Sequence, residues 1–155
     1  MKKIIQVFTT LLVSLLFTQM AQAAVDADAI KTSLMTAREN LVAMIGTPDA
    51  AAQDKYQEEI TKATKGVDDG VAAALADKGT LPEQVTKLEA FNKVWGEFKK
   101  TRDDEIIPAI KAGKVEDAKK LAITVQAERM KAMKGTLSEL GAKPDPAAKL
   151  EAGAK

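Results

Sequence analysis

Apolar residues recur at alternating steps of three and four along most of the chain after residue 25, as in Ile30, Leu34, Ala37 and Leu41. This spacing places side chains on one stripe of an α-helix, whereas a half-buried strand would need steps of two. The pattern fills four segments: 26–45, 48–77, 81–112 and 115–140. The sequence therefore predicts four amphipathic helices and an all-α fold.

Helix-stopping residues separate the four segments. Glycines follow three of them: Gly46, Gly79 and Gly113. Thr47 is expected to cap the second helix, with Pro48 at its first position, where a missing N–H costs nothing. Thr80 is expected to cap the third helix in a capping box with Glu83. Connections this short between long helices predict an antiparallel up-down-up-down four-helix bundle.

Three residues inside the segments interrupt the helical pattern. Pro108 removes one backbone hydrogen bond and is expected to kink the last turn of the third helix. Gly66 and Gly70 weaken the second helix, since each glycine costs up to about 1 kcal/mol relative to alanine. These glycines either permit a close approach between helices or mark the least stable part of the bundle.

The two ends of the chain differ from the middle. Residues 1–23 combine a positive start, a short apolar run and a small-x-small site, which is typical of a secretory signal peptide cut after Ala23. The apolar run is short for a membrane span, which needs about 20 residues, although an uncleaved anchor is the alternative. We expect residues 24–141 to form the bundle and residues 142–155 to be a disordered tail. Export of this kind points to a bacterial periplasm, with full secretion as the alternative.

The composition excludes several kinds of function. The chain has 155 residues, with 23 basic and 22 acidic side chains and neither histidine nor cysteine. Balanced charge argues against a nucleic-acid partner, which favours a concentrated basic face. Without histidine and cysteine, standard zinc sites and histidine- or cysteine-based catalytic centres cannot form. We therefore expect no enzyme activity, no metal and no cofactor.

Arginine is rare in this chain: Arg38, Arg102 and Arg129 stand against twenty lysines. Arg102 and Arg129 fall on the apolar stripes, and Arg38 flanks one. At 1.5 Å per residue, folding the bundle brings all three within roughly 12 Å of axial height. Because arginine presents a rigid fork of donors suited to carboxylate or phosphate, a shared pocket for an anion is one interpretation.

The other interpretation of the arginines is internal. An arginine at a bundle seam often pairs with a carboxylate of a neighbouring helix, or extends its head group to water. The acidic residues expected at the same height are Glu58, Glu59, Glu105 and Glu128. The adjacent acidic run of residues 103–105 is expected to be a solvated patch.

The single tryptophan, Trp95, lies one to two turns before Arg102 on the same predicted face, between Phe91 and Phe98. It is a candidate to contact the apolar part of a ligand. The alternative is a core position, where its indole N–H needs a hydrogen-bond partner.

The last two predicted helices resemble a known family. Their shared features are Trp95, the Arg102-Asp103 pair, Ile106-Ile107, and Ala112-Gly113 followed by Glu116-Asp117-Ala118. In these features the chain resembles the four-helix-bundle ligand-binding domain of methyl-accepting chemotaxis proteins. The resemblance implies a bundle that senses small molecules outside the cell, with arginines near a helix interface holding anionic ligands. The membrane span, linker module and signalling hairpin that follow this domain in those receptors are missing, so we expect a stand-alone exported relative.

Two functions follow from these observations. The first is a periplasmic, sensor-like bundle that binds a small anionic molecule, as a homodimer or with a separate receptor. The second is a structural, adaptor or chaperone-like bundle that works through protein–protein contacts. The second function predicts a fully packed interior and an exposed apolar patch.

Overall fold

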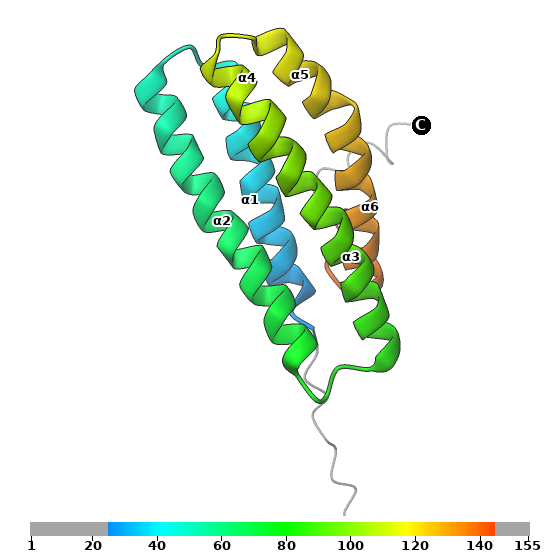
Figure 1. Cartoon of the computed structure of the whole chain (residues 1–155). Coiled ribbons are helices and arrows are strands. Elements are labelled where there is room, and N and C mark those ends of the chain that lie inside the picture. Colours follow the sequence, from blue (N-terminus) through cyan, green and yellow to red (C-terminus); the bar gives the residue numbers. More distant parts are fainter. Residues whose placement is uncertain (1–24, 145–155) are drawn as a thin grey trace, which may run out of the picture.

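The computed structural model describes residues 25–144 as four helical arms packed antiparallel (Figure 1). The arms are α1 (Ala27–Gly46); α2 (Ala50–Ala76); α3 (Pro82–Thr101) with the π-helical turn η1 (Arg102–Ile106) and α4 (Ile107–Lys111); and α5 (Val115–Ile123) with α6 (Val125–Glu139). The predicted all-α four-helix bundle is confirmed, and residues 25–144 contain no strand. The predicted signal peptide lies outside the described residues.

The four arms form a ring in which each arm contacts two others. Helix α1 packs on α2 and on α5 and α6, while α3 packs on α2 and on α6. The turn between α1 and α2 and the turn between α4 and α5 lie at one pole, which we call the upper pole (Figure 1). No helix in residues 25–144 has both the length and the apolar content that a membrane span requires.

The contact between α1 and α2 is very close, because α2 presents glycine to α1. A methyl group built on Gly70 would lie 2.7 Å from Cγ1 of Ile30, and one on Gly66 would lie 2.6 Å from Oγ of Ser33. Both separations are shorter than carbon and oxygen atoms tolerate. Of the two roles considered for these glycines, the close approach is the one that the structure has.

The N-terminal caps lie slightly later than the sequence suggested. Asp49, rather than Thr47, caps α2, because its side chain accepts hydrogen bonds from the N–H groups of Ala51 (2.8 Å) and Ala52 (3.1 Å). Likewise α3 begins at Pro82, and Thr80 donates to the Ala74 carbonyl instead of capping the helix.

The predicted capping box of Thr80 and Glu83 is replaced one residue further on. There the side chain of Gln84 accepts a hydrogen bond from the N–H of Leu81 (3.0 Å). An aspartate two positions away or a glutamine one position away meets the same unpaired N–H groups of a helix start, which is why spacing alone did not separate the candidates.

Glycines with positive φ end the third and fourth arms, at Gly113 (φ 72°) and Gly141 (φ 100°). Beyond Gly141, the N–H of Ala142 donates to the Leu137 carbonyl (2.9 Å), and both residues are buried together. This is the Schellman arrangement, which satisfies the last carbonyls of a helix. The tail expected from residue 142 therefore does not begin there, since Ala142 packs on the bundle and the N–H of Lys143 bonds Asp28. Residues 145–155 lie outside the described part.

The third arm contains a π-helical turn before Pro108, where a kink was expected. In η1 the N–H of Ile107 bonds the carbonyl of Arg102, five residues back. This turn inserts one residue into the helical register. The buried apolar residues at its end and beyond are Ile106, Ile107 and Ile110, whereas the alternation of three and four steps would continue inward to Glu105 and Ala109. The extra residue thus keeps Glu105 outside and isoleucine inside.

The fourth arm is broken at Thr124, which was not predicted. Thr124 has φ −106° and ψ −95°, outside the α region, and its hydroxyl donates to the Lys120 carbonyl (2.6 Å). Beyond this break the first two buried residues are Gln126 and Met130. Continuation of the apolar stripe from Ala118 and Ala122 would place Val125 and Arg129 inward, but the inward positions lie one residue later, and Val125 is 39% exposed.

The core is divided into two clusters. The lower cluster joins α3 to α1, α2 and α6, and its largest side chains are Trp95, Phe91, Phe98, Ile30, Leu34, Leu88, Met133 and Leu137. The upper cluster lies toward the pole with Gly113 and consists of Leu41, Met44, Ile45, Ile60, Ile106, Ile107, Ile110 and Ala118. The polar residues that become candidates for function lie near the level where the two clusters meet.

Candidate functional site

Arg102 is buried, with 4% of its surface exposed, and its whole guanidinium group is engaged inside the bundle. Nε and Nη2 donate to the two carboxylate oxygens of Asp103 (2.7 and 3.0 Å), and Nη1 donates to the hydroxyl of Thr64 on α2 (2.9 Å). Its Cζ also lies 5.8 Å from the centre of the Trp95 ring. Bidentate pairing of this kind is the strongest form of arginine–carboxylate contact.

Arg129 joins α6 to α3. Its Nη1 donates to the hydroxyl of Thr101 (2.7 Å) and to the side-chain oxygen of Gln126 (3.2 Å). Its Nε lies 3.6 Å from a carboxylate oxygen of Glu97. Because the side chain is about one-fifth exposed, this longer ion pair is partly screened by water.

Arg38 is different from the other two arginines. It lies on the exposed side of α1, and within residues 25–144 it makes no ion pair or hydrogen bond. Two adjoining surface hollows between α1 and α6 share it as a lining residue. Its donors are therefore available to a molecule that enters either hollow.

The three arginines do not form a common pocket. Arg102 reaches from the third arm to α2, Arg129 reaches from α6 to α3, and Arg38 lies between α1 and α6. Their similar height along the bundle gives no shared site, because the side chains leave their helices in different directions.

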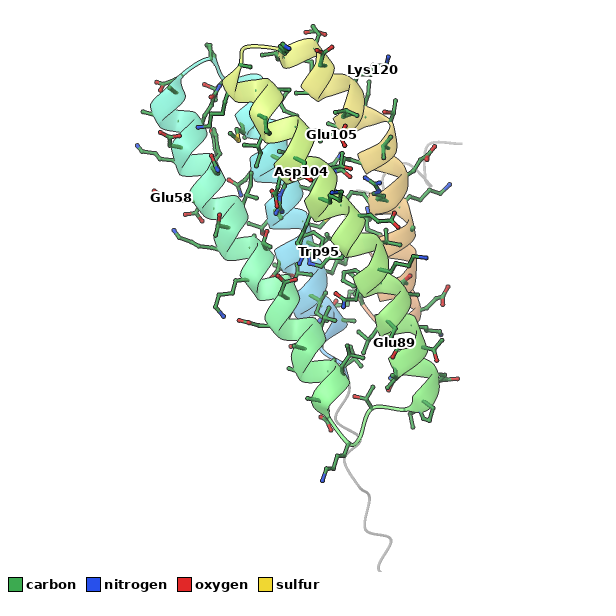
Figure 2. All side chains as sticks on the ribbon, in the orientation of Figure 1. Glu58, Glu89, Trp95, Asp104, Glu105 and Lys120 are labelled. Atoms are coloured by element: carbon green, nitrogen blue, oxygen red, sulfur yellow. The ribbon has the colours of Figure 1, made fainter. Side chains whose placement is uncertain are left out.

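The carboxylates expected to pair with the arginines are not the ones used. Asp103 and Glu97 take that role, while Glu59 pairs with Lys62 at the surface (2.6 Å). Glu58 lies on the outside of α2 (Figure 2). Side chains at adjacent helix positions do not normally face each other, so the Arg102–Asp103 pair could not be inferred from helical spacing.

Trp95 is a core residue in this structure. Its surface is fully buried, its indole N–H donates to Asp68 (2.7 Å), and its ring stacks on Phe98 with centres 5.5 Å apart. Lys99 bonds the same oxygen of Asp68 (2.7 Å) and lies 5.4 Å from the indole ring centre. Figure 2 shows the tryptophan inside the bundle. Contact between Trp95 and a ligand stays a prediction, and it would require the core to open.

The most promising concave surface runs between α1 and the fourth arm, and we call it the α1–α6 groove. Its upper hollow, about 210 Å³, is lined by Arg38, Leu41, Val42, Phe98, Ala122, Ile123, Gln126, Ala127 and Met130. Its lower hollow, about 500 Å³, is lined by Met35, Arg38, Glu39, Ala127, Met130, Lys131 and Lys134. Small sites for organic molecules have this character: mostly apolar walls with a few polar groups that orient the ligand.

The electrostatics of the groove favour an anion. Among the residues that line the lower hollow, Arg38, Lys131 and Lys134 are basic, and Glu39 is the one acidic residue. At the base of the upper hollow, the buried amide of Gln126 donates to the Phe98 carbonyl (2.9 Å). The groove thus offers an apolar floor and a cationic rim.

Sequence reasoning missed Gln126 and Met130 as groove residues. Both depend on the shift of register at Thr124, which moves them into the positions expected for Val125 and Arg129. A signal was present in the run of steps of four through Ala118, Ala122, Gln126 and Met130. Each step of four residues turns about 40° beyond a full turn of the helix. Three such steps therefore rotate the stripe around the helix by roughly the angle of one residue.

The acidic run of residues 103–105 is solvent-exposed, and two of its members are paired: Asp103 with Arg102, and Asp104 with Lys100 (3.1 Å). In the part of the chain that the structure describes, no acidic cluster has the arrangement of a metal site.

Comparison with known proteins gives one family. The family described as a four helix bundle sensory module for signal transduction matches residues 3–152, which is most of the chain. No curated protein and no solved structure matches.

Proposed function

Because the chain belongs to the four-helix-bundle sensory modules of signal transduction, we propose that it is a periplasmic sensor that binds a small anion in the α1–α6 groove. Arg38 is the anchor in this proposal, since its donors are not used by a carboxylate within residues 25–144. This one observation carries the proposal. The guanidinium group would bind a carboxylate or phosphate through its fork of donors.

The other predicted ligand residues take supporting roles in the proposal. Arg129 fixes the side chain of Gln126, which forms the base of the upper hollow. Arg102 and Trp95 hold α3 against α2 through Thr64 and Asp68. Their loss would lower stability first, and affinity only as a consequence.

Calorimetry with a panel of carboxylates and phosphates tests the site directly. For any anion that binds, Arg38→Ala should weaken affinity at least about tenfold, because hydrogen bonds to charged groups contribute about 1.5–3 kcal/mol. Lys120→Ala is the matched control, since Lys120 points away from the bundle on α5 (Figure 2). If Arg38→Ala and Lys120→Ala bind equally well, Arg38 is not the anchor.

Export is a separate part of the proposal. The sequence of residues 1–23 supports cleavage after Ala23 by a signal peptidase. Mass spectrometry of protein from the periplasmic fraction would give a mature chain that begins at Ala24. A chain that retains Met1 in the membrane fraction would instead support an anchored form. We propose no catalytic activity, because the chain has neither histidine nor cysteine.

A protein partner is the second candidate function. Val42 is 50% exposed and Ile123 is 74% exposed, and both lie at the rim of the upper hollow. Exposed apolar side chains that gather at a groove favour a second macromolecule, including a second copy of this chain. Light scattering across a range of concentrations distinguishes a monomer from a homodimer.

A further inference from the structure

The third and fourth arms lose regular α-helical geometry at the same level of the bundle. The third arm does so in η1, directly after Thr101, and the fourth at Thr124. Two contacts place these irregularities side by side: Gln126 donates to the carbonyl of Phe98 (2.9 Å), and Arg129 donates to the hydroxyl of Thr101 (2.7 Å). The irregularities are thus joined by side chains that lie two and five residues beyond Thr124.

The same level separates the two clusters of the core. The upper cluster includes Ile106 and Ala118, and the lower cluster includes Phe98 and Met130. Three of the four buried polar residues in the described chain lie between them: Thr101, Arg102 and Gln126. We call Thr101, Arg102, Gln126 and Arg129 the polar layer.

We propose that the polar layer is a hinge. The upper part of the third and fourth arms, α4 and α5, tilts as a unit relative to α3 and α6, with the bends in η1 and at Thr124. The lower apolar cluster stays intact during this motion, while α4 and α5 shift their part of the upper cluster against α1 and α2. The contacts that change at the layer itself are hydrogen bonds, which water replaces more readily than it replaces packed side chains. A π-helical turn within an α-helix is often found at a functional site.

The position of the α1–α6 groove links this hinge to ligand binding, a link that rests on the function proposed above. Ala122 and Ile123 line the upper hollow from before the break at Thr124, and Ala127 and Met130 line it from beyond the break. The opposite wall belongs to α1, which runs unbroken past the layer. A molecule bound at Arg38 therefore contacts both sides of the hinge and fixes the angle between α5 and α6.

Spin labels measure the hinge directly, and the chain has no cysteine to remove first. Lys120→Cys on α5 and Glu89→Cys on α3 form a pair across the layer; both side chains lie on the outside (Figure 2). Ala72→Cys with Glu89→Cys forms a control pair below the layer. We expect the distance distribution across the layer to be about twofold broader than that of the control pair. Equal widths would overturn the hinge.

Two glutamine variants test the role of the layer. Gln126→Ala removes the bond to the Phe98 carbonyl and should broaden the distribution across the layer further. Gln53→Ala is the matched control, since Gln53 is also buried and donates to a backbone carbonyl, that of Thr47 (2.9 Å), at the upper pole. An equal effect of both variants contradicts the assignment of the layer.

Hydrogen exchange of the unaltered protein keeps the test independent of these variants. Amides of residues 103–107 and 124–128 should exchange faster than those of the flanking turns, and uniform protection through both arms would contradict the hinge. Addition of benzoate or inorganic phosphate distinguishes a failure of the proposed anion site at Arg38 from a failure of the proposed hinge. If neither probe binds in calorimetry, the anion site at Arg38 loses its support while the hinge is judged on the unliganded distances. If a probe binds but does not narrow the distance distribution between positions 89 and 120, only the link between ligand binding and the hinge is overturned.

Discussion

At Gly70 the two closest helices leave no room for a methyl group. Gly70→Ala would press a Cβ against Cγ1 of Ile30 at 2.7 Å, a methylene next to the branched Cβ that cannot swing away as the end of a long side chain would. We expect a loss of about 1–3 kcal/mol in the free energy of unfolding, the usual range for overpacking. Urea denaturation measures it.

Gly96 is the matched control for that substitution. It lies within α3, and a Cβ there meets no atom within 4 Å. Gly96→Ala should therefore stabilise the protein, by up to about 1 kcal/mol, because alanine restricts the unfolded chain and favours helix. If both substitutions have the same sign, close approach is not the reason for glycine at position 70.

Asp68 is the side chain on which the buried tryptophan depends. Asp68→Ala would leave the indole N–H of Trp95 without its partner inside the bundle, at a cost of about 1–3 kcal/mol. Asp69→Ala is the comparison, since within residues 25–144 Asp69 forms an ion pair with the exposed Lys65 alone and should change stability by less than about 1 kcal/mol. Trp95 is the only tryptophan, so its fluorescence reports the transition directly.

At the scale of the element, the cap of α2 separates two neighbouring candidates. Asp49→Ala removes the acceptor for the N–H groups of Ala51 and Ala52 and should cost about 1 kcal/mol. Thr47→Ala removes only one weaker acceptor contact, with the N–H of Asp49 (3.2 Å). Thermal unfolding of the two variants ranks them, and a larger effect at Thr47 would restore the cap expected from the sequence.

The four arms and their glycine ends follow from spacing and stop residues, which is why the sequence predicts the bundle. The π-helical turn η1 and the break at Thr124 do not follow from spacing and stop residues, because at both places side-chain packing competes with the regular helical period. In the third arm, steps of four through Phe98, Arg102, Ile106 and Ile110 drift around the helix, and burial of the isoleucines outweighs regular hydrogen bonding. A run of equal steps of four is thus the feature that predicts such a turn.

The candidate site could be predicted only in part, for the same reason. The spacing of apolar residues places Arg38 beside the apolar stripe of the first helix, and in the structure Arg38 is exposed beside that stripe. It cannot identify Gln126, whose position depends on the break at Thr124, nor the pairing of Arg102 with its neighbour Asp103. Both are set by local backbone geometry rather than by the pattern of apolar residues.

At the scale of the whole molecule, a contact joins the first helix to the end of the last. The N–H of Lys143 donates to Asp28 (2.7 Å), the ammonium group of Lys143 lies 3.4 Å from the same carboxylate, and Lys31 donates to the Lys143 carbonyl (2.7 Å). The hydrogen bond from the Lys143 N–H is the main cause that holds the pKa of Asp28 below its ordinary value; the ammonium groups of Lys143 and Lys31 add to it.

This contact predicts a pH dependence with a definite sign. Because folding lowers the pKa of Asp28, the carboxylate stabilises the folded state above the ordinary aspartate pKa, and this contribution disappears as the pH falls below about 4. The melting temperature of Asp28→Asn should therefore be lower than that of the unaltered protein at neutral pH, with the two converging in acid. A difference that persists at low pH would contradict a charge-dependent contact.

The bond between Asp28 and Lys143 also brings the start of α1 and the end of α6 to the same pole, opposite the exposed turn at Gly113. The first and last described residues therefore lie at one pole. A circular permutant that opens at Gly113 and replaces residues 1–24 and 145–155 by a short glycine linker between Val25 and Pro144 should recover the same bundle. A fluorescent reporter fused to the new N-terminus would then be attached directly to α5.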